Sequence, residues 1–136
     1  MMLTSKNFKM HESGTPQLLR IRVEALDFIR ITFTQNRNFA TKDFPIIEVS
    51  NKGVDFCRHL QNGVSYSKKL FFHSFELGKK HDFFILTNRS KVIFGTFEDF
   101  HFHTYGFYTY DELDTLPYIG FSSLKEMEWT VEKGFH

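Results

Sequence analysis

The sequence has a single cysteine, almost no net charge and no long apolar run, and each shortage excludes a class of protein. Its single cysteine, Cys57, excludes an internal disulfide framework and a zinc site built from several cysteines, and it is typical of a reducing compartment such as the cytoplasm. The 17 Lys and Arg residues nearly balance the 16 Asp and Glu residues. No overall field would therefore hold DNA, RNA or an anionic membrane. No apolar run reaches the roughly 18 residues of a membrane-spanning helix, so membrane insertion is not expected.

Phenylalanine is the residue present in excess. The 136 residues include 18 Phe but only 8 Gly and 3 Pro. Large flat side chains favour β-structure around an aromatic core, and the length is that of one domain. Residues 1–18 show no sustained period and predict a flexible N-terminal arm, which leaves 19–136 as a single folded domain.

Alternation of apolar and polar residues predicts a chain of short antiparallel strands. The first strand is expected to run from Arg20 to Phe33, with a bend or bulge at Asp27. An Asn51-Lys52-Gly53 turn predicts a hairpin. The expected strands cover residues 20–33, 44–50, 54–57, 69–75, 81–87, 91–97, 100–108 and 117–121.

The pattern changes near the C-terminus, where Ser123 and Glu126 form a capping-box sequence. Leu124, Met127 and Val131 follow at helical spacing, so we expect a helix over 124–133. The predicted fold is therefore mainly β, a small antiparallel barrel of six to seven strands with one C-terminal helix. Closure into a barrel is expected because it removes exposed strand edges.

The segment Glu48-Val49-Ser50-Asn51-Lys52-Gly53 is the first candidate binding site. Alternation places Glu48 and Ser50 on one outer face, where a carboxylate and a hydroxyl can accept from and donate to a purine edge. Arg20 and Arg22 share the polar face of the first strand, and arginine can bind a phosphate or guanine bidentately. The plainer interpretation is an ordinary hairpin beside a solvated strand face.

The order of these elements resembles the PilZ domain, a bacterial six-stranded barrel that is a receptor for cyclic di-GMP. Its signatures are R-x-x-x-R before the barrel and D/N-x-S-x-x-G on it. Ser50 and Gly53 match the second, Glu48 stands where Asp or Asn is usual, and only one arginine of the first is present. The resemblance implies a non-catalytic cytoplasmic signalling module without cofactors. It would bind cyclic di-GMP through Arg20, Arg22, Glu48, Ser50 and Gly53, and relay this to a protein partner in motility, surface attachment or biofilm control.

Two alternatives stay open. One is a degenerate adaptor of the same family that binds no nucleotide and contacts a partner protein through a Phe-rich surface. The other is a small metal-dependent barrel enzyme, because Gly95 and the pair His101 and His103 match the opening of a cupin motif. Cys57 lacks the sequence context of a nucleophile, and there is no phosphate loop, so catalysis is not expected.

Overall fold

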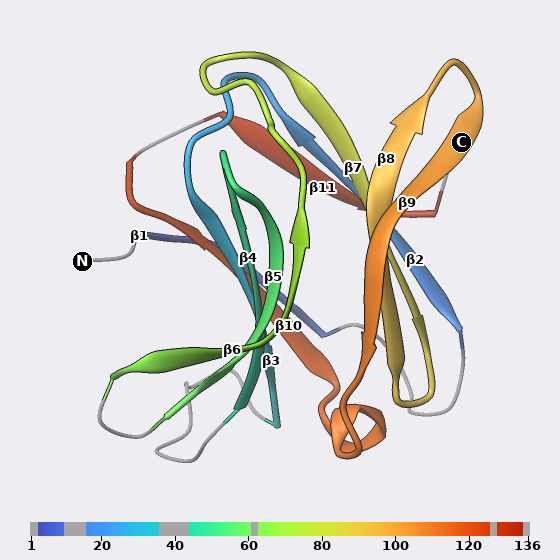
Figure 1. The fold of residues 1–136 in the computed structure, drawn as a ribbon. Helices are drawn as coiled ribbons and strands as arrows, with labels where there is room; N and C mark the ends of the chain where they lie inside the picture. Colours follow the sequence, from blue (N-terminus) through green and yellow to red (C-terminus); the bar gives the residue numbers. More distant parts are fainter. Residues whose placement is uncertain (1–2, 10–15, 36–43, 61–62, 126–127, 135–136) are drawn as a thin grey trace.

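The protein is a sandwich of two antiparallel β-sheets, seen in Figure 1 as two separate layers of strands. The computed structural model describes residues 3–9, 16–35, 44–60, 63–125 and 128–134. One sheet has six strands, in the order β1 (Leu3–Lys9), β10 (Tyr118–Ser123), β3 (Ile29–Thr34), β4 (Phe44–Ser50), β5 (Gly53–His59) and β6 (Ser65–Phe72). The other has five, in the order β11 (Trp129–Lys133), β2 (Gln17–Val23), β7 (His81–Asn88), β8 (Lys91–Glu98) and β9 (His101–Thr109).

The core lies between the two sheets and takes every second side chain from each. Ile21 of β2 and Phe83 of β7 come from the five-stranded sheet, and Ile31 of β3 and Ile47 of β4 from the six-stranded one. All four are completely buried in one cluster. Because alternate residues of a strand point to opposite faces, this cluster defines an inner and an outer face for each sheet.

The prediction of a mainly antiparallel β-protein is confirmed, but the prediction of a closed barrel is wrong. The outermost strands, β1 and β6 in one sheet and β11 and β9 in the other, do not pair across the layers. The physical reason lies in the expected strand over 20–33, which divides at Leu26 into β2 and β3 of different sheets. Leu26 is buried, and its amide donates to the carbonyl of Lys79 (2.9 Å), which holds the crossover in place.

The predicted helix over 124–133 is also wrong. Residues Trp129–Lys133 instead form β11, which pairs with β2 in the register Val131–Ile21. The Ser123 hydroxyl donates to the carbonyl of Lys125 (2.6 Å), and Glu126 and Met127 lie outside the described residues. Pairing with β2 satisfies the backbone groups of this segment, so tertiary contacts override the helical spacing of its apolar side chains.

The expected N-terminal arm over 1–18 carries structure as well. Leu3–Lys9 form β1 at the edge of the six-stranded sheet, paired with β10, and β2 begins at Gln17. The predicted hairpin is confirmed, since β4 and β5 pair through Ser50–Gly53 with Asn51 and Lys52 in the turn. A short 3-10 helix, η1 (Leu113–Thr115), lies between β9 and β10. Within the described part of the chain, no helix is long and apolar enough to cross a membrane.

Gly53 has a structural role that its position in this hairpin explains. Its φ is +139°, and a Cβ added there would lie 2.1 Å from the carbonyl oxygen of Phe71 on β6. Glycine therefore allows β6 to approach the hairpin closely.

We expect Gly53→Ala to lower the free energy of unfolding by about 2 kcal/mol, because the added methyl group must push β6 away. Urea unfolding followed by circular dichroism measures this change. Gly63→Ala is the matched control, since Gly63 also has a left-handed backbone (φ +86°) but open space at its Cβ position. Equal losses in both variants would show that backbone strain, and not the approach of β6, requires Gly53.

Candidate functional site

The structure separates the residues that the sequence analysis grouped into one site. Arg20 and Arg22 of β2 alternate with the buried Leu19 and Ile21, so they lie on the outer face of the five-stranded sheet. Glu48 and Ser50 of β4 alternate with buried inner residues too, and they lie on the outer face of the six-stranded sheet. The outer faces of a sandwich point away from each other. The two arginines and the Glu48–Ser50 pair are therefore not brought together.

Arg20 is held by a neighbouring strand of its own sheet. Its Nε and Nη2 donate to the carboxylate of Asp82 on β7 at 3.0 and 2.5 Å, and its guanidinium lies 5.2 Å from the ring centre of Phe97. Hydrogen bonding to Asp82 raises the pKa of Arg20. Arg22 approaches the same carboxylate at 3.8 Å. This arrangement is a cross-strand ion pair that fixes β2 against β7.

A polar row crosses the outer face of the six-stranded sheet instead. The strand register places Ser122, Arg30, Glu48 and Asp55 side by side on β10, β3, β4 and β5, and we call these four residues the polar row. Arg30 donates from Nε (3.1 Å) and Nη2 (2.8 Å) to Oε2 of Glu48. The side chains of Arg30 and Glu48 are only 21% and 16% exposed, so this ion pair is rigid and partly shielded from solvent.

The rows on either side of the polar row complete the face. Toward the β4–β5 turn, Ser50 lies opposite Gly53 and then Phe72, whose side chain is 83% exposed. On the other side, the Ser67 hydroxyl donates to Oδ1 of Asp55 at 2.6 Å. Hydroxyls, carboxylates, a guanidinium and an exposed aromatic ring thus share one surface.

His59 lies at the far end of this surface. Its Nδ1 is 3.1 Å from the Ser65 hydroxyl, and its ring centre is 4.9 Å from that of Phe44. Burial lowers the pKa of His59, and the charge of Arg30 lowers it further, while Glu48 opposes the shift. The neutral imidazole is therefore the form that the fold favours.

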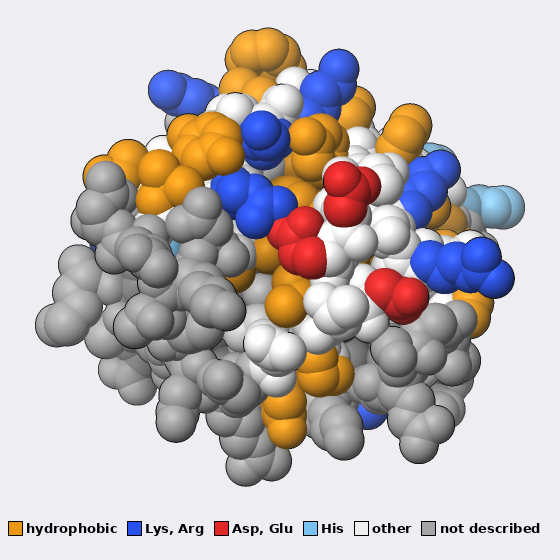
Figure 2. Space-filling view, turned by 90° about the horizontal axis from the view of Figure 1, so that it is seen from below, with side chains coloured by type: hydrophobic (Ala, Val, Ile, Leu, Met, Phe, Trp, Pro, Cys, Tyr) orange, Lys and Arg blue, Asp and Glu red, His pale blue; other side chains and the backbone are white. Residues whose placement is uncertain are grey.

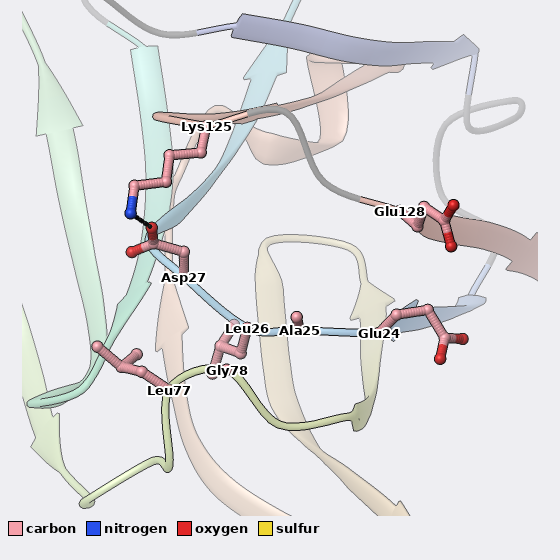
Figure 3. Close-up of a pocket in the computed structure, with 8 residues that line it drawn as sticks. All are labelled: Glu24, Ala25, Leu26, Asp27, Leu77, Gly78, Lys125 and Glu128. Atoms are coloured by element: carbon pink, nitrogen blue, oxygen red, sulfur yellow. Dashed lines mark ion pairs between the residues drawn. The ribbon is translucent and has the colours of Figure 1, made fainter.

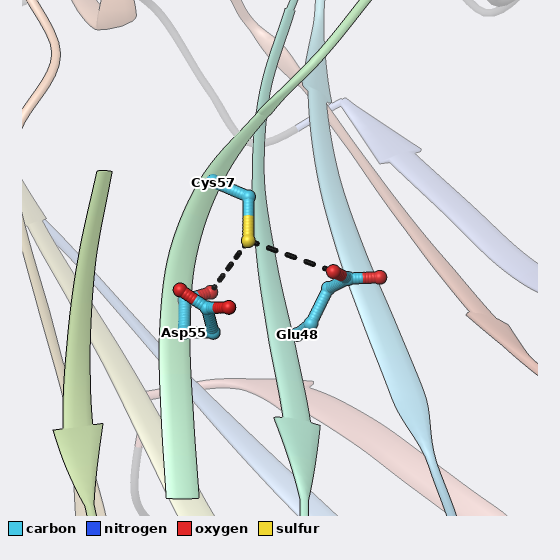
Figure 4. Close-up of side chains that lie close together, drawn as sticks. All are labelled: Glu48, Asp55 and Cys57. Carbon is cyan, nitrogen blue, oxygen red and sulfur yellow. Dashed lines mark hydrogen bonds between the residues drawn. The ribbon is translucent and has the colours of Figure 1, made fainter. Parts of the chain in front are cut away.

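Cys57 lies beside two carboxylates in the same surface (Figure 4). The ligand atoms of Glu48, Asp55 and Cys57 are within 4.8 Å of one another, the spacing of a metal site. The Sγ atom lies 3.5 Å from Oε1 of Glu48 and 3.5 Å from the carbonyl oxygen of Asp55, so its single hydrogen has two acceptors in reach. Burial raises the pKa of Cys57, and the charges of Asp55 and Glu48 raise it further. The protonated thiol is a poor nucleophile, and a metal ion at this site would have to displace its proton and compete with Arg30 for Glu48.

The histidine pair of the cupin-like alternative lies at the start of β9. His101 and His103 are both exposed on β9, with ring centres 6.4 Å apart. Among the described residues, no third His, Cys, Asp or Glu joins them at metal-ligand spacing. Two exposed imidazoles fall short of the three protein ligands that a catalytic zinc site needs.

A cavity of about 580 Å³ opens near the β2–β3 crossover, and none of these residues lines it (Figure 3). One side carries the ion pair between Asp27 and Lys125 (3.4 Å), and Figure 3 shows Glu24 and Glu128 at the opposite side. The side chain of Lys125 is 79% exposed. The cavity is lined by Glu24, Ala25, Leu26, Asp27, Leu77, Gly78, Lys125 and Glu128. Its charged groups are less firmly held than those of the polar row, which makes the sheet face the better-built site.

The end of the sandwich that carries η1 has side chains of both charge signs. Figure 2 shows acidic side chains gathered near the middle of the visible surface, with Lys and Arg side chains and hydrophobic groups around them. Arg58 of β5 forms an ion pair with Glu112 next to η1. The described surface at this end therefore offers no uniform positive field to a nucleic acid.

The sequence analysis missed Arg30 and Asp55 as site residues. The signal for Asp55 is present in the hairpin, because a turn at Asn51 and Lys52 pairs Ser50 with Gly53 and hence Glu48 with Asp55. Arg30 has no such local signal, since β3 joins β4 through residues 36–43, which lie outside the described part of the chain.

The lowered pKa of His59 predicts a dependence of stability on pH. Below the ordinary value of 6.5 the unfolded chain binds a proton that the folded protein resists, so stability falls as the pH decreases through this range. We expect His59→Gln to weaken this dependence between about pH 5 and pH 6.5. Urea unfolding of both proteins across that range checks it. Parallel pH profiles would contradict the assignment to His59.

Comparisons with known proteins identify a fold and no family. No protein-family model matches the chain, and no curated protein matches it by sequence. Among solved structures, sheep galectin-11 in complex with glycerol matches over 96% of both chains, with a TM-score of 0.61 and 10% sequence identity. The likeness establishes that this chain has a galectin-like β-sandwich fold.

Proposed function

We propose that the protein is a non-catalytic binding module that takes a small, neutral, polyhydroxylated ligand on the outer face of the six-stranded sheet. The observation that carries this proposal is the polar row, in which Arg30, Glu48 and Asp55 are held side by side at the surface. A sugar or another polyol is the ligand class that this chemistry suits.

The polar row matches hydroxyl groups because each hydroxyl both donates and accepts a hydrogen bond. Carboxylate oxygens of Glu48 and Asp55 accept, and the guanidinium of Arg30 donates. The Arg30–Glu48 ion pair and the Ser67–Asp55 hydrogen bond fix these groups before any ligand arrives. Little side-chain entropy is then lost on binding.

Phe72 supplies an apolar element beside the polar groups. It is 83% exposed and lies on the same face as Ser50. A ligand with hydroxyls at its edge and an apolar ring face can contact both the aromatic ring and the polar row. Sites of this mixed kind combine aromatic contact area with a few placed polar groups.

The charge of the face favours a neutral ligand over a phosphate. Two carboxylates, Glu48 and Asp55, stand beside one guanidinium, Arg30, so the row is acidic by formal charge. A phosphodiester would be repelled by the carboxylates and would compete with Glu48 for Arg30. The cyclic di-GMP hypothesis remains a prediction that the placement of Arg20 and Arg22 on the other sheet does not support.

The state of the one thiol of the sequence supports binding over catalysis. The Cys57 thiol is buried, and its raised pKa keeps it protonated. The solved galectin structure of the same fold holds glycerol, a polyol, which supports the same ligand class.

We expect wild-type protein to bind at least one member of a panel of neutral mono- and disaccharides, and Asp55→Ala to weaken that binding about tenfold. The change removes an acceptor and leaves the core intact. Shifts of backbone amide signals in NMR titrations measure the affinity and show which strands respond.

Asp114→Ala is the matched control, because Asp114 is an exposed aspartate on η1, away from the polar row. It should bind as wild type does. Cyclic di-GMP forms a second arm of the titration. Binding of the dinucleotide with loss in Arg20→Ala, or sugar binding that is unchanged in Asp55→Ala, would contradict the proposal.

A further inference from the structure

The four outermost strands of the two sheets differ sharply in charge. Lysine occurs in three of them, as Lys6 and Lys9 in β1, Lys68 and Lys69 in β6, and Lys133 in β11. β9, with the sequence HFHTYGFYT, has no Lys, Arg, Asp, Glu or Pro in nine residues. Charged side chains, above all lysine, and prolines are the usual protection of an exposed strand edge against pairing with another chain. β9 is thus the outermost described strand without charged residues or proline, and its one bulge, at Tyr105, lies beyond its first four residues.

The first half of β9 is also accessible. β9 pairs with β8 alone among the described strands, and His101–Thr104 are all exposed. Farther along, the ring of Phe71 lies against Gly106, where a Cβ would be 2.4 Å from it, and Tyr105 contacts His73. These contacts cover part of the second half. The backbone groups available for pairing are therefore those around His101–Thr104.

Aromatic side chains surround this accessible edge. Phe102 is 52% exposed and packs on Phe97 of β8 with ring centres 5.2 Å apart. Phe100, in the turn before β9, is 90% exposed and has a left-handed backbone with φ +64°. A bulky residue rarely adopts this conformation, and it displays the ring in solvent. Of the other phenylalanines between residues 71 and 102, Phe75, Phe83, Phe84 and Phe94 are buried, whereas Phe72 is exposed on the other sheet.

We propose that β9 pairs with β9 of a second copy of this chain, antiparallel and across a two-fold axis, so that the two five-stranded sheets become one continuous sheet. The occupant is a second copy because two uncharged edges meet without like-charge repulsion, whereas the exposed Lys68 and Lys69 of β6 disfavour pairing at that edge. A two-fold contact uses each β9 edge once, so assembly ends at a dimer. The polar row lies on the other sheet and stays accessible in both copies.

Sedimentation velocity of the full chain at a series of micromolar concentrations tests this inference. We expect the wild type to reach the dimer, and Thr104→Lys to remain monomeric with a dissociation constant raised at least about tenfold. Thr130→Lys is the matched control, because Thr130 is an exposed threonine on β11, an outermost strand that already carries charge. It should dimerise as the wild type does.

Hydrogen exchange of the wild type adds a readout at the backbone. Amides in His101–Thr104 should exchange more slowly at high protein concentration, while those of β11 should not change. His103→Lys repeats the test if Thr104→Lys does not fold. A wild type that stays monomeric, or a dimer that persists in both lysine variants of β9, would overturn the proposal. Either result would leave the sugar-binding proposal untouched, since that site lies on the other sheet.

Discussion

Burial of one face of each sheet in a common core is the constraint on which the rest of this structure depends. Ile21 and Phe83 from one sheet meet Ile31 and Ile47 from the other in a single completely buried cluster. Once these inner faces are chosen, period-two alternation leaves no freedom for the remaining side chains. Arg20 must face one side of the molecule and Glu48 the opposite side. The same constraint that stabilises the fold therefore decides which polar groups can act together.

The charged groups on the outer faces of the two sheets have different roles. On the five-stranded sheet, Arg20 and Asp82 form a cross-strand ion pair next to Phe97, and this pair fixes strand register. On the six-stranded sheet, Arg30 pairs with Glu48, and Asp55 lies next to Glu48 on the neighbouring strand. Carboxylate oxygens therefore share this face with the exposed Phe72. In the first arrangement, Arg20 and Asp82 bind each other. The second keeps acceptors available at the surface, which is why it supports the binding proposal.

In an open sandwich, each outermost strand needs its own protection against pairing with another chain, whereas a barrel has no exposed edges. Lysines and a bulge protect β6, and β11 is short and charged. β9 has a bulge at Tyr105 but no charged residue, and the exposed Phe100 and Phe102 lie beside it. The contrast among edges of one molecule is more informative than the composition of β9 alone. Ligand binding and self-association would then use different sheets, so that one would not obstruct the other.

The sequence by itself determined the class of fold, most strand positions and the shared face of Glu48 and Ser50, because alternation and turn chemistry are local properties. The strands at 44–50, 81–88 and 91–98 and the turn at Asn51 and Lys52 follow from these patterns almost residue by residue. Only the tertiary structure decided that the chain crosses between sheets at Leu26, and that residues 129–133 pair with β2 as a strand. It also decided that Arg30, and not Arg20 or Arg22, lies beside Glu48. Alternation tells which side chains share a face of a strand, but the choice of neighbouring strand comes from long-range packing that no local pattern contains.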